Sequence, residues 1–167
     1  MAKKPAMAKK PAVLFVCLGN ICRSPLAEAA FRREAERIGL DVEIDSAGTG
    51  DWHIGRAPDP RALAVARANG EEIGHYRARQ VEPQDFRRFG HIVALDAQNL
   101  ADLIAMRPAD GTADLTLLLD HVEGREGEAV ADPYYGEEAG FHVTWGDVTT
   151  GAEALARRIA GESQARG

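Results

Sequence analysis

The residues best suited to chemistry lie in one short segment, 17–25, which reads CLGNICRSP. An apolar run precedes it and Pro25 stands where a helix would begin, so the segment is predicted to join a buried strand to a helix N-terminus. The first N–H groups of a helix have no intrahelical partner, and Gly19 and Asn20 tolerate the positive φ that turns successive amides towards one point. The segment therefore predicts a backbone cradle for an anion.

Cys17 and Arg23 are the reactive side chains of this segment. Converging amides and the positive end of a helix dipole both favour a thiolate at Cys17. Arg23, with five residues between it and Cys17, can curl back over the cradle and offer a planar fork to two phosphate oxygens. Ser24 is expected to cap the helix. Taken singly, the two residues could be an inert core thiol and a surface charge, but the joint pattern indicates sulfur attacking a tetrahedral oxyanion.

Two other kinds of site fit the segment poorly. The run Gly-x4-Gly-Lys followed by Ser or Thr is missing, so no magnesium-held triphosphate is implied. Cys17 and Cys22 are the only cysteines, too few thiolates for a zinc site and too close together for the framework of a secreted domain. We therefore expect no metal and no cofactor.

Strands and helices alternate around this segment. This order predicts right-handed crossovers and a single α/β domain with an open parallel sheet covered on both faces, whose sites lie beyond the carboxyl ends of the strands. The predicted strands are 13–16, 42–44, 92–95 and 115–119; the predicted helices run from Pro25 to Gly39, from Asp59-Pro60 to near Gly70, through Leu100, Leu103 and Ile104, and through Val148, Ala152, Leu155 and Ile159.

Composition limits the classes of partner. A chain of 167 residues with 45% hydrophobic and 28% charged residues is typical of one soluble domain, and its net charge of −6 argues against a nucleic-acid partner. No apolar run approaches the roughly eighteen residues of a membrane span, so we expect a cytoplasmic protein with no membrane contact. We expect a disordered basic arm over 1–12, where the unit MAKKPA occurs twice, the domain over 13–161, and a flexible tail over 162–167.

Residues 13–25 resemble the signature loop of the low-molecular-weight protein tyrosine phosphatases. The resemblance continues in 45–48, 51–52, 55–61, 78–81, 96–100 and 132–136, and it covers about residues 12–160. It implies a four-stranded parallel sheet with flanking helices, no metal, and hydrolysis of a phosphotyrosine protein or a small aryl phosphate through a cysteinyl phosphate on Cys17. We expect a monomer.

The resemblance also implies roles for residues outside the loop. Asp132, 115 positions beyond Cys17, is implied to protonate the leaving tyrosine oxygen and later to activate water. Trp52, Tyr134 and Tyr135 are implied to line a deep aromatic slot. We expect the loop itself to surround the phosphate, through Leu18, Gly19, Asn20, Ile21, Cys22 and Ser24.

The support of Asn20 is the part of the resemblance that this sequence matches least well. Family members hold that residue with side chains corresponding to Ser24, Ser46 and a histidine. The run after His75 is one residue longer than the usual His-x-Ala-Arg. Either the side chain of His75 reaches the residues around Asn20 across an insertion, or the position of the family histidine is changed in this chain.

Cys22 has two interpretations. It can be a small apolar filler behind the loop, or it can attack a sulfenic acid formed on Cys17 and close a reversible disulfide. The resemblance favours the second interpretation, because family members with this cysteine pair are reversibly inactivated by peroxide.

Three alternative functions fit the sequence less well. A protein-arginine phosphatase of the same family typically has Thr where Ile21 stands. A thioredoxin-coupled arsenate reductase needs a further cysteine, and none follows Cys22. A module that only binds phosphoproteins needs neither the sulfur of Cys17 nor the carboxyl of Asp132.

Overall fold

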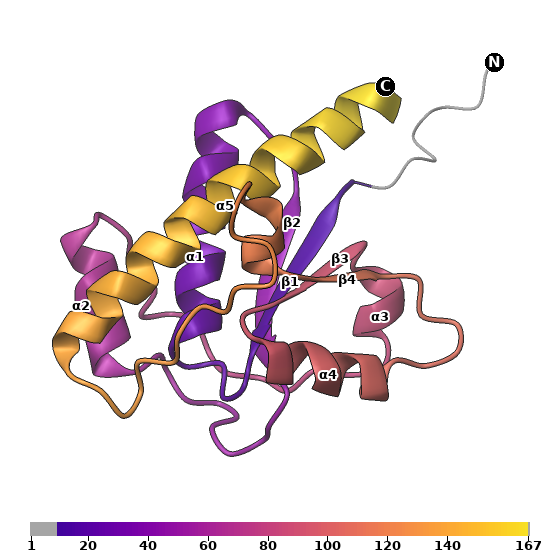
Figure 1. Cartoon of the computed structure of the whole chain (residues 1–167). Coiled ribbons are helices and arrows are strands. Elements are labelled where there is room, and N and C mark those ends of the chain that lie inside the picture. Colours follow the sequence, from indigo (N-terminus) through magenta and orange to yellow (C-terminus); the bar gives the residue numbers. More distant parts are fainter. Residues whose placement is uncertain (1–9, 167) are drawn as a thin grey trace.

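The computed structural model describes residues 10–166 and confirms the predicted fold class. Four parallel strands form one sheet in the order β2-β1-β3-β4, with helices on both faces (Figure 1). The strands are β1 (Ala12–Cys17), β2 (Glu43–Gly48), β3 (His91–Ala94) and β4 (Asp114–Leu117); the helices are α1 (Arg23–Ile38), α2 (Pro60–Ala68), α3 (Asp85–Arg88), α4 (Ala97–Met106), the 3-10 turn η2 (Leu118–His121) and α5 (Glu138–Arg166).

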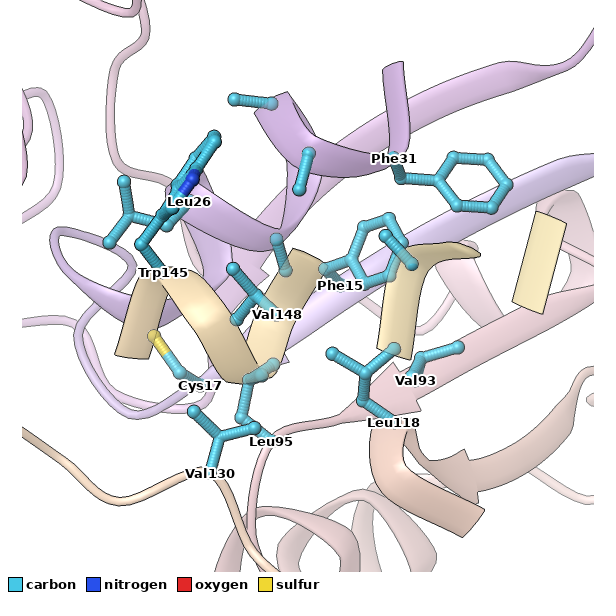
Figure 2. Packing of buried hydrophobic residues seen from close by; sticks show 14 of the residues in the cluster. Phe15, Cys17, Leu26, Phe31, Val93, Leu95, Leu118, Val130, Trp145 and Val148 are labelled. Carbon is cyan, nitrogen blue, oxygen red and sulfur yellow. The ribbon is translucent and has the colours of Figure 1, made fainter. Parts of the chain in front are cut away.

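The central strand β1 is buried on both faces, and its alternate side chains enter two separate cores. Phe15 lies in the core under α1, α2 and α5, where its ring centroid is 5.4 Å from that of Phe31 (Figure 2). Leu14 lies in the second core with Phe86 of α3 and Leu103 of α4. Because helices cover both faces, the continuous apolar run of β1 is satisfied throughout its length.

Several predicted boundaries are corrected by the structure. Helix α1 begins at Arg23 rather than at Pro25, and its N-cap is Cys22 without a side-chain hydrogen bond, so Ser24 does not cap it. Strand β2 continues to Gly48 because it pairs with the whole of β1. Strand β4 ends at Leu117, since the next residues turn into η2.

The predicted end of α1 and start of α2 are confirmed, and one predicted core residue of α4 is corrected. Gly39 caps α1 with a φ of 72°, the left-handed conformation that glycine accepts most readily. Asp59 caps α2, where its carboxylate accepts from Arg61 N–H. On α4, Leu103 is fully buried, but Ile104 is 60% exposed and does not face the core.

The ends of the domain differ from the expected boundaries. Ala12, predicted to end the arm, is the first residue of β1, and residues 1–9 lie outside the described part. Residues 162–166, predicted as tail, continue α5. Glu162 accepts a hydrogen bond from Arg158 Nε, and its Oε1 lies 3.2 Å from His91 Nε2. Within residues 10–166, no helix has both the length and the apolar character for a membrane crossing.

His121 ends η2 with its ring enclosed between β4 and α5. Its Nδ1 lies 3.1 Å from an Arg158 nitrogen, and its Nε2 lies 2.9 Å from Thr116 Oγ1. Burial, followed by the positive charges of Arg158 and His91, lowers the pKa of His121, and Asp120 and Asp114 oppose this only in part. The folded protein therefore favours the neutral ring.

This preference predicts a pH-dependent stability. The unfolded chain takes up a proton on His121 near pH 6.5 while the folded chain resists it, so stability should be full above that pH and decline as the pH falls towards the lowered folded pKa. Urea unfolding at pH 7.5 and pH 5 measures the decline. His121→Gln should reduce it, whereas His142→Gln, at an exposed position of α5, should not. An identical decline in both variants would contradict the prediction.

Candidate active site

The loop after β1 is shaped by one strained residue and one close backbone approach. Asn20 has a φ of 58°, the only positive φ of a non-glycine residue in the described chain. Its Oδ1 accepts from Arg79 N–H at 2.9 Å, and its Nδ2 donates to Ser24 Oγ at 2.8 Å and to Ser46 Oγ at 3.0 Å. A Cβ at Gly48 of β2 would lie 2.6 Å from Leu18 O, so the loop packs directly on that glycine. The predicted loop conformation is thus held from β2 and from the segment around Arg79.

Cys17 lies at the carboxyl end of β1, at the bottom of this loop. Its side chain is 3% exposed, and its Sγ lies 3.1 Å from Ser24 Oγ. Ser24 therefore turns its hydroxyl inward to the sulfur and to Asn20, which explains why it does not cap α1.

Arg23 is almost completely buried and is held by three groups. Its NH1 donates to Asp96 Oδ2 at 2.7 Å and to Val130 O at 3.0 Å, and its NH2 lies 3.5 Å from Asp132 Oδ2. Its Nε is buried with no hydrogen-bond partner among residues 10–166. Burial opposes the charge, but the neighbouring Cys17, Asp96 and Asp132 raise the pKa of Arg23 overall, so a fixed guanidinium faces the loop.

Asp96 was not predicted as a site residue, although it belongs to a segment that resembles the family. It follows β3 directly and caps α4, where its Oδ1 accepts from Asn99 N–H at 2.7 Å. A carboxylate at a strand's carboxyl end, next to that of β1, is the signal that could have identified it.

Asp132 comes from the segment that leads into α5. Its side chain is 40% exposed, and its Oδ1 accepts from Tyr134 N–H at 3.0 Å. The structure thus brings Asp132 to the arginine that follows the loop, across more than a hundred residues of sequence.

Cys17, Arg23 and Asp132 line one cavity of about 380 Å³. Trp52 and Tyr135 stand at its mouth, 66% and 94% exposed, and the Tyr134 and Tyr135 rings meet edge to face at 4.8 Å. Asn20, Ser24 and Ser46 are not among its lining residues and support the loop instead. The cavity is lined by Cys17, Leu18, Gly19, Ile21, Cys22, Arg23, Trp52, His53, Asp132, Tyr134 and Tyr135.

His75 does not support the loop, and this corrects one predicted site residue. It is exposed, and its ring packs against Tyr76 with 4.8 Å between centroids. The extra residue of this segment leaves the half-buried Tyr76 at the inner position, while Ser46 donates to Glu28 Oε1 at 2.8 Å. Glu28 was missed in the sequence because nothing local distinguishes it from other helix glutamates.

Cys22 is buried beside the cavity, and both cysteines are free thiols. Burial raises the pKa of Cys22 well above its ordinary value, and the nearby charges of Asp59 and Cys17 add to the effect. Cys22 is thus a protonated thiol near neutral pH. In the part of the chain that the structure describes, no group of three or more His, Cys, Asp or Glu side chains is arranged to hold a metal ion.

A parallel α/β sheet with a cysteine and an arginine around a loop shaped for an anion defines the class of cysteine-dependent phosphatases. Residues 12–165 match the family model described as low molecular weight phosphotyrosine protein phosphatase. The chain belongs to this family, and it is a protein-tyrosine phosphatase, a hydrolase.

Individual relatives agree with this assignment. The low molecular weight phosphotyrosine protein phosphatase of Schizosaccharomyces pombe is 46% identical over 138 residues, which cover 81% of this chain and 88% of the relative. The crystal structure of YfkJ from Bacillus subtilis has a TM-score of 0.85 at 42% identity and covers 92% of this chain and 97% of its own. A drosophila arginine phosphatase is more distant, with a TM-score of 0.83 at 31% identity over 88% of this chain and 96% of its own.

Proposed function

We propose that this protein hydrolyses phosphotyrosine in proteins, and small aryl phosphates, through a cysteinyl phosphate on Cys17. The observation that carries the proposal is that Cys17, Arg23 and Asp132 line one cavity, in which the buried guanidinium has an Nε without a hydrogen-bond partner among the described residues. A phosphate oxygen would accept a hydrogen bond from this Nε–H.

In the first step the Cys17 thiolate attacks phosphorus and the bond to the tyrosine oxygen breaks. Asp132, protonated, gives its proton to that oxygen, so that tyrosine leaves as the neutral phenol. Arg23 and the loop amides stabilise the charge on the equatorial oxygens. Asp96 and Val130 O hold Arg23 NH1, which leaves Nε and NH2 for the phosphoryl group.

In the second step water replaces the sulfur. The Asp132 carboxylate takes a proton from the water, whose oxygen attacks phosphorus while the S–P bond breaks. Inorganic phosphate is released, and Cys17 returns to the thiolate. Asp132 is partly exposed and lines the same cavity as Cys17 and Arg23, so its carboxyl group can reach both the leaving oxygen and a water, which supports both of its roles.

The substrate class follows from the walls of the cavity. Trp52, Tyr134 and Ile21 offer aromatic and apolar surface above the loop, which suits the flat ring of a phosphotyrosine better than a phosphoserine or a phosphoarginine. Hydrolysis of matched phosphotyrosine, phosphoarginine and phosphoserine peptides by the purified protein tests this. Phosphotyrosine should have the highest kcat/KM, and a higher value for phosphoarginine would replace the proposal with the related activity.

Reversible oxidation of the cysteine pair is a further part of the proposal. Peroxide converts the Cys17 thiolate to a sulfenic acid; the Cys22 sulfur then attacks it, water leaves and a disulfide forms. Because burial raises the pKa of Cys22, this sulfur must first lose its proton, and disulfide formation should accelerate with pH.

The prediction is tested with peroxide followed by dithiothreitol, with activity and intact mass as readouts. Wild type should lose two hydrogens and recover fully, whereas Cys22→Ser should gain oxygen and recover poorly, because no thiol intercepts the sulfenic acid. Matching recovery in both proteins would leave Cys22 as a packing residue.

A further inference from the structure

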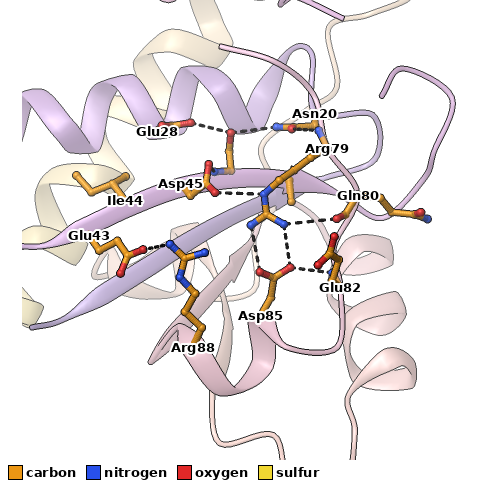
Figure 3. Close-up of polar contacts among 12 residues, drawn as sticks. Asn20, Glu28, Glu43, Ile44, Asp45, Arg79, Gln80, Glu82, Asp85 and Arg88 are labelled. Atoms are coloured by element: carbon orange, nitrogen blue, oxygen red, sulfur yellow. Dashed lines mark hydrogen bonds and ion pairs between the residues drawn. The ribbon is translucent and has the colours of Figure 1, made fainter. Parts of the chain in front are cut away.

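The amide of Asn20 has a defined orientation, because one of its neighbours can only donate. Arg79 N–H is a donor, so the atom 2.9 Å from it must be Asn20 Oδ1. The two hydrogens of Nδ2 then go to the hydroxyl oxygens of Ser24 and Ser46. Figure 3 shows Asn20 between Arg79 on one side and Glu28 on the other.

Each serine hydroxyl, once it accepts from Asn20, must send its own hydrogen elsewhere. Ser46 donates to Glu28 Oε1 at 2.8 Å. Ser24 has Cys17 Sγ at 3.1 Å, and its other acceptor, Ala47 O, is more distant at 3.5 Å. The orientation of Asn20 therefore leaves the Ser24 hydrogen free for the sulfur, the nearer of these two acceptors.

A flipped amide would reverse this arrangement. Oδ1 would then face both hydroxyls and accept their hydrogens, and Ser24 would no longer donate to Cys17. Two groups oppose the flip: Arg79 N–H, which would meet an NH2 group, and the Glu28 carboxylate, which accepts only and so requires the hydrogen of Ser46.

Both groups are held firmly. The Arg79 side chain pairs with the buried Asp85 through NH1 at 3.0 Å and NH2 at 3.1 Å, and with Asp45 through Nε at 3.2 Å (Figure 3). Glu28 is 6% exposed, and its Oε2 accepts from Arg32 NH2 at 2.8 Å. Burial raises the pKa of Glu28, while its bonds to Ser46 and Arg32 favour the carboxylate.

We propose that Glu28 is a positioning residue which, through Ser46 and Asn20, keeps the Ser24 hydroxyl donating to Cys17 Sγ. The Glu28 carboxylate, which is linked to the Cys17 sulfur through several hydrogen bonds, thereby sets which group donates and which accepts at each step of this chain. This inference rests on the proposed function, because it concerns the ionisation of the proposed nucleophile.

The test follows Cys17 itself rather than turnover. The rate of its alkylation by iodoacetamide is measured against pH, with the modified cysteine located by mass spectrometry. In Glu28→Gln the new amide can donate to Ser46, so the flipped state of Asn20 becomes accessible and the Ser24 bond to the thiolate weakens. Since a hydrogen bond donated to the thiolate favours the ionised sulfur, its loss should move the alkylation profile up by about one to two pH units. Values of kcat/KM should fall at acidic pH and recover as the pH rises.

Glu34→Gln is the matched control. Glu34 is also on α1, is 5% exposed and pairs with Arg37, but it has no bond to the chain of Ser46 and Asn20. It should leave the alkylation profile in place even where thermal unfolding shows a loss of stability. Ser46→Ala removes the hydroxyl that links Glu28 to Asn20 but keeps the charge of Glu28. It should reproduce the shift of the alkylation profile, and it provides the test if Glu28→Gln fails to fold.

The double variant Ser24→Ala/Glu28→Gln decides whether the effect passes through the hydroxyl. It should show no shift beyond that of Ser24→Ala alone. A profile that stays in place in both Glu28→Gln and Ser46→Ala, or a shift that persists undiminished in the Ser24→Ala background, overturns the inference. Because alkylation needs no substrate, a failure here is distinct from a failure of the phosphatase mechanism.

Discussion

Replacing Cys17 with serine is expected to reduce kcat for phosphotyrosine peptides by roughly 10⁴-fold or more, since removal of a catalytic nucleophile has effects on this scale. A serine hydroxyl has no anionic form near neutral pH. Within residues 10–166 the hydrogen-bond partner of Cys17 Sγ is Ser24 Oγ alone, so the loop amides and Arg23 should stay in place.

Binding of inorganic phosphate provides the control for Cys17→Ser. Calorimetric titration should show an affinity close to that of wild type, and thermal unfolding should show an intact domain. Substantial residual turnover in a preparation free of other phosphatases would reject Cys17 as the nucleophile.

Replacing Asp132 with alanine is expected to slow phosphotyrosine hydrolysis by about 10²–10⁴-fold, the usual contribution of a general acid. A nitrophenyl ester should lose far less, because its leaving group is stable without a proton.

Glu137→Ala is a suitable control for Asp132→Ala, because it removes an exposed carboxylate five residues further along the same segment. It should leave the ratio between the two substrates close to that of wild type. Equal losses on both substrates in Asp132→Ala would assign the general acid to another group.

Features encoded by neighbouring residues were predictable from the sequence. The buried run of β1, the capping of α2 by Asp59 and the end of α1 at Gly39 each depend on residues within one or two turns. The spacing of Cys17 and Arg23 likewise placed both around one loop, because a strand followed directly by a helix leaves little freedom for the chain between them.

Asp132 was identified only by resemblance to a family, and the structure supplies the physical reason for its position. The parallel sheet gathers the carboxyl ends of its strands at one edge, and the segment before α5 returns to that edge, where Val130 and Asp132 both contact Arg23. A turn-forming Asp-Pro pair carries no local sign of this contact.

The supports of the loop were decided by the tertiary structure alone. Ser24 resembles a helix cap in sequence but bonds to Cys17 and Asn20, His75 is carried to the surface, and Glu28 takes the hydrogen of Ser46. Each outcome depends on which buried donors and acceptors meet across the packed layers, and a buried polar group bonds to whatever partner that packing provides. The sequence by itself thus determined the four strands, the four longer helices and the reactive loop, whereas packing decided which side chains orient that loop.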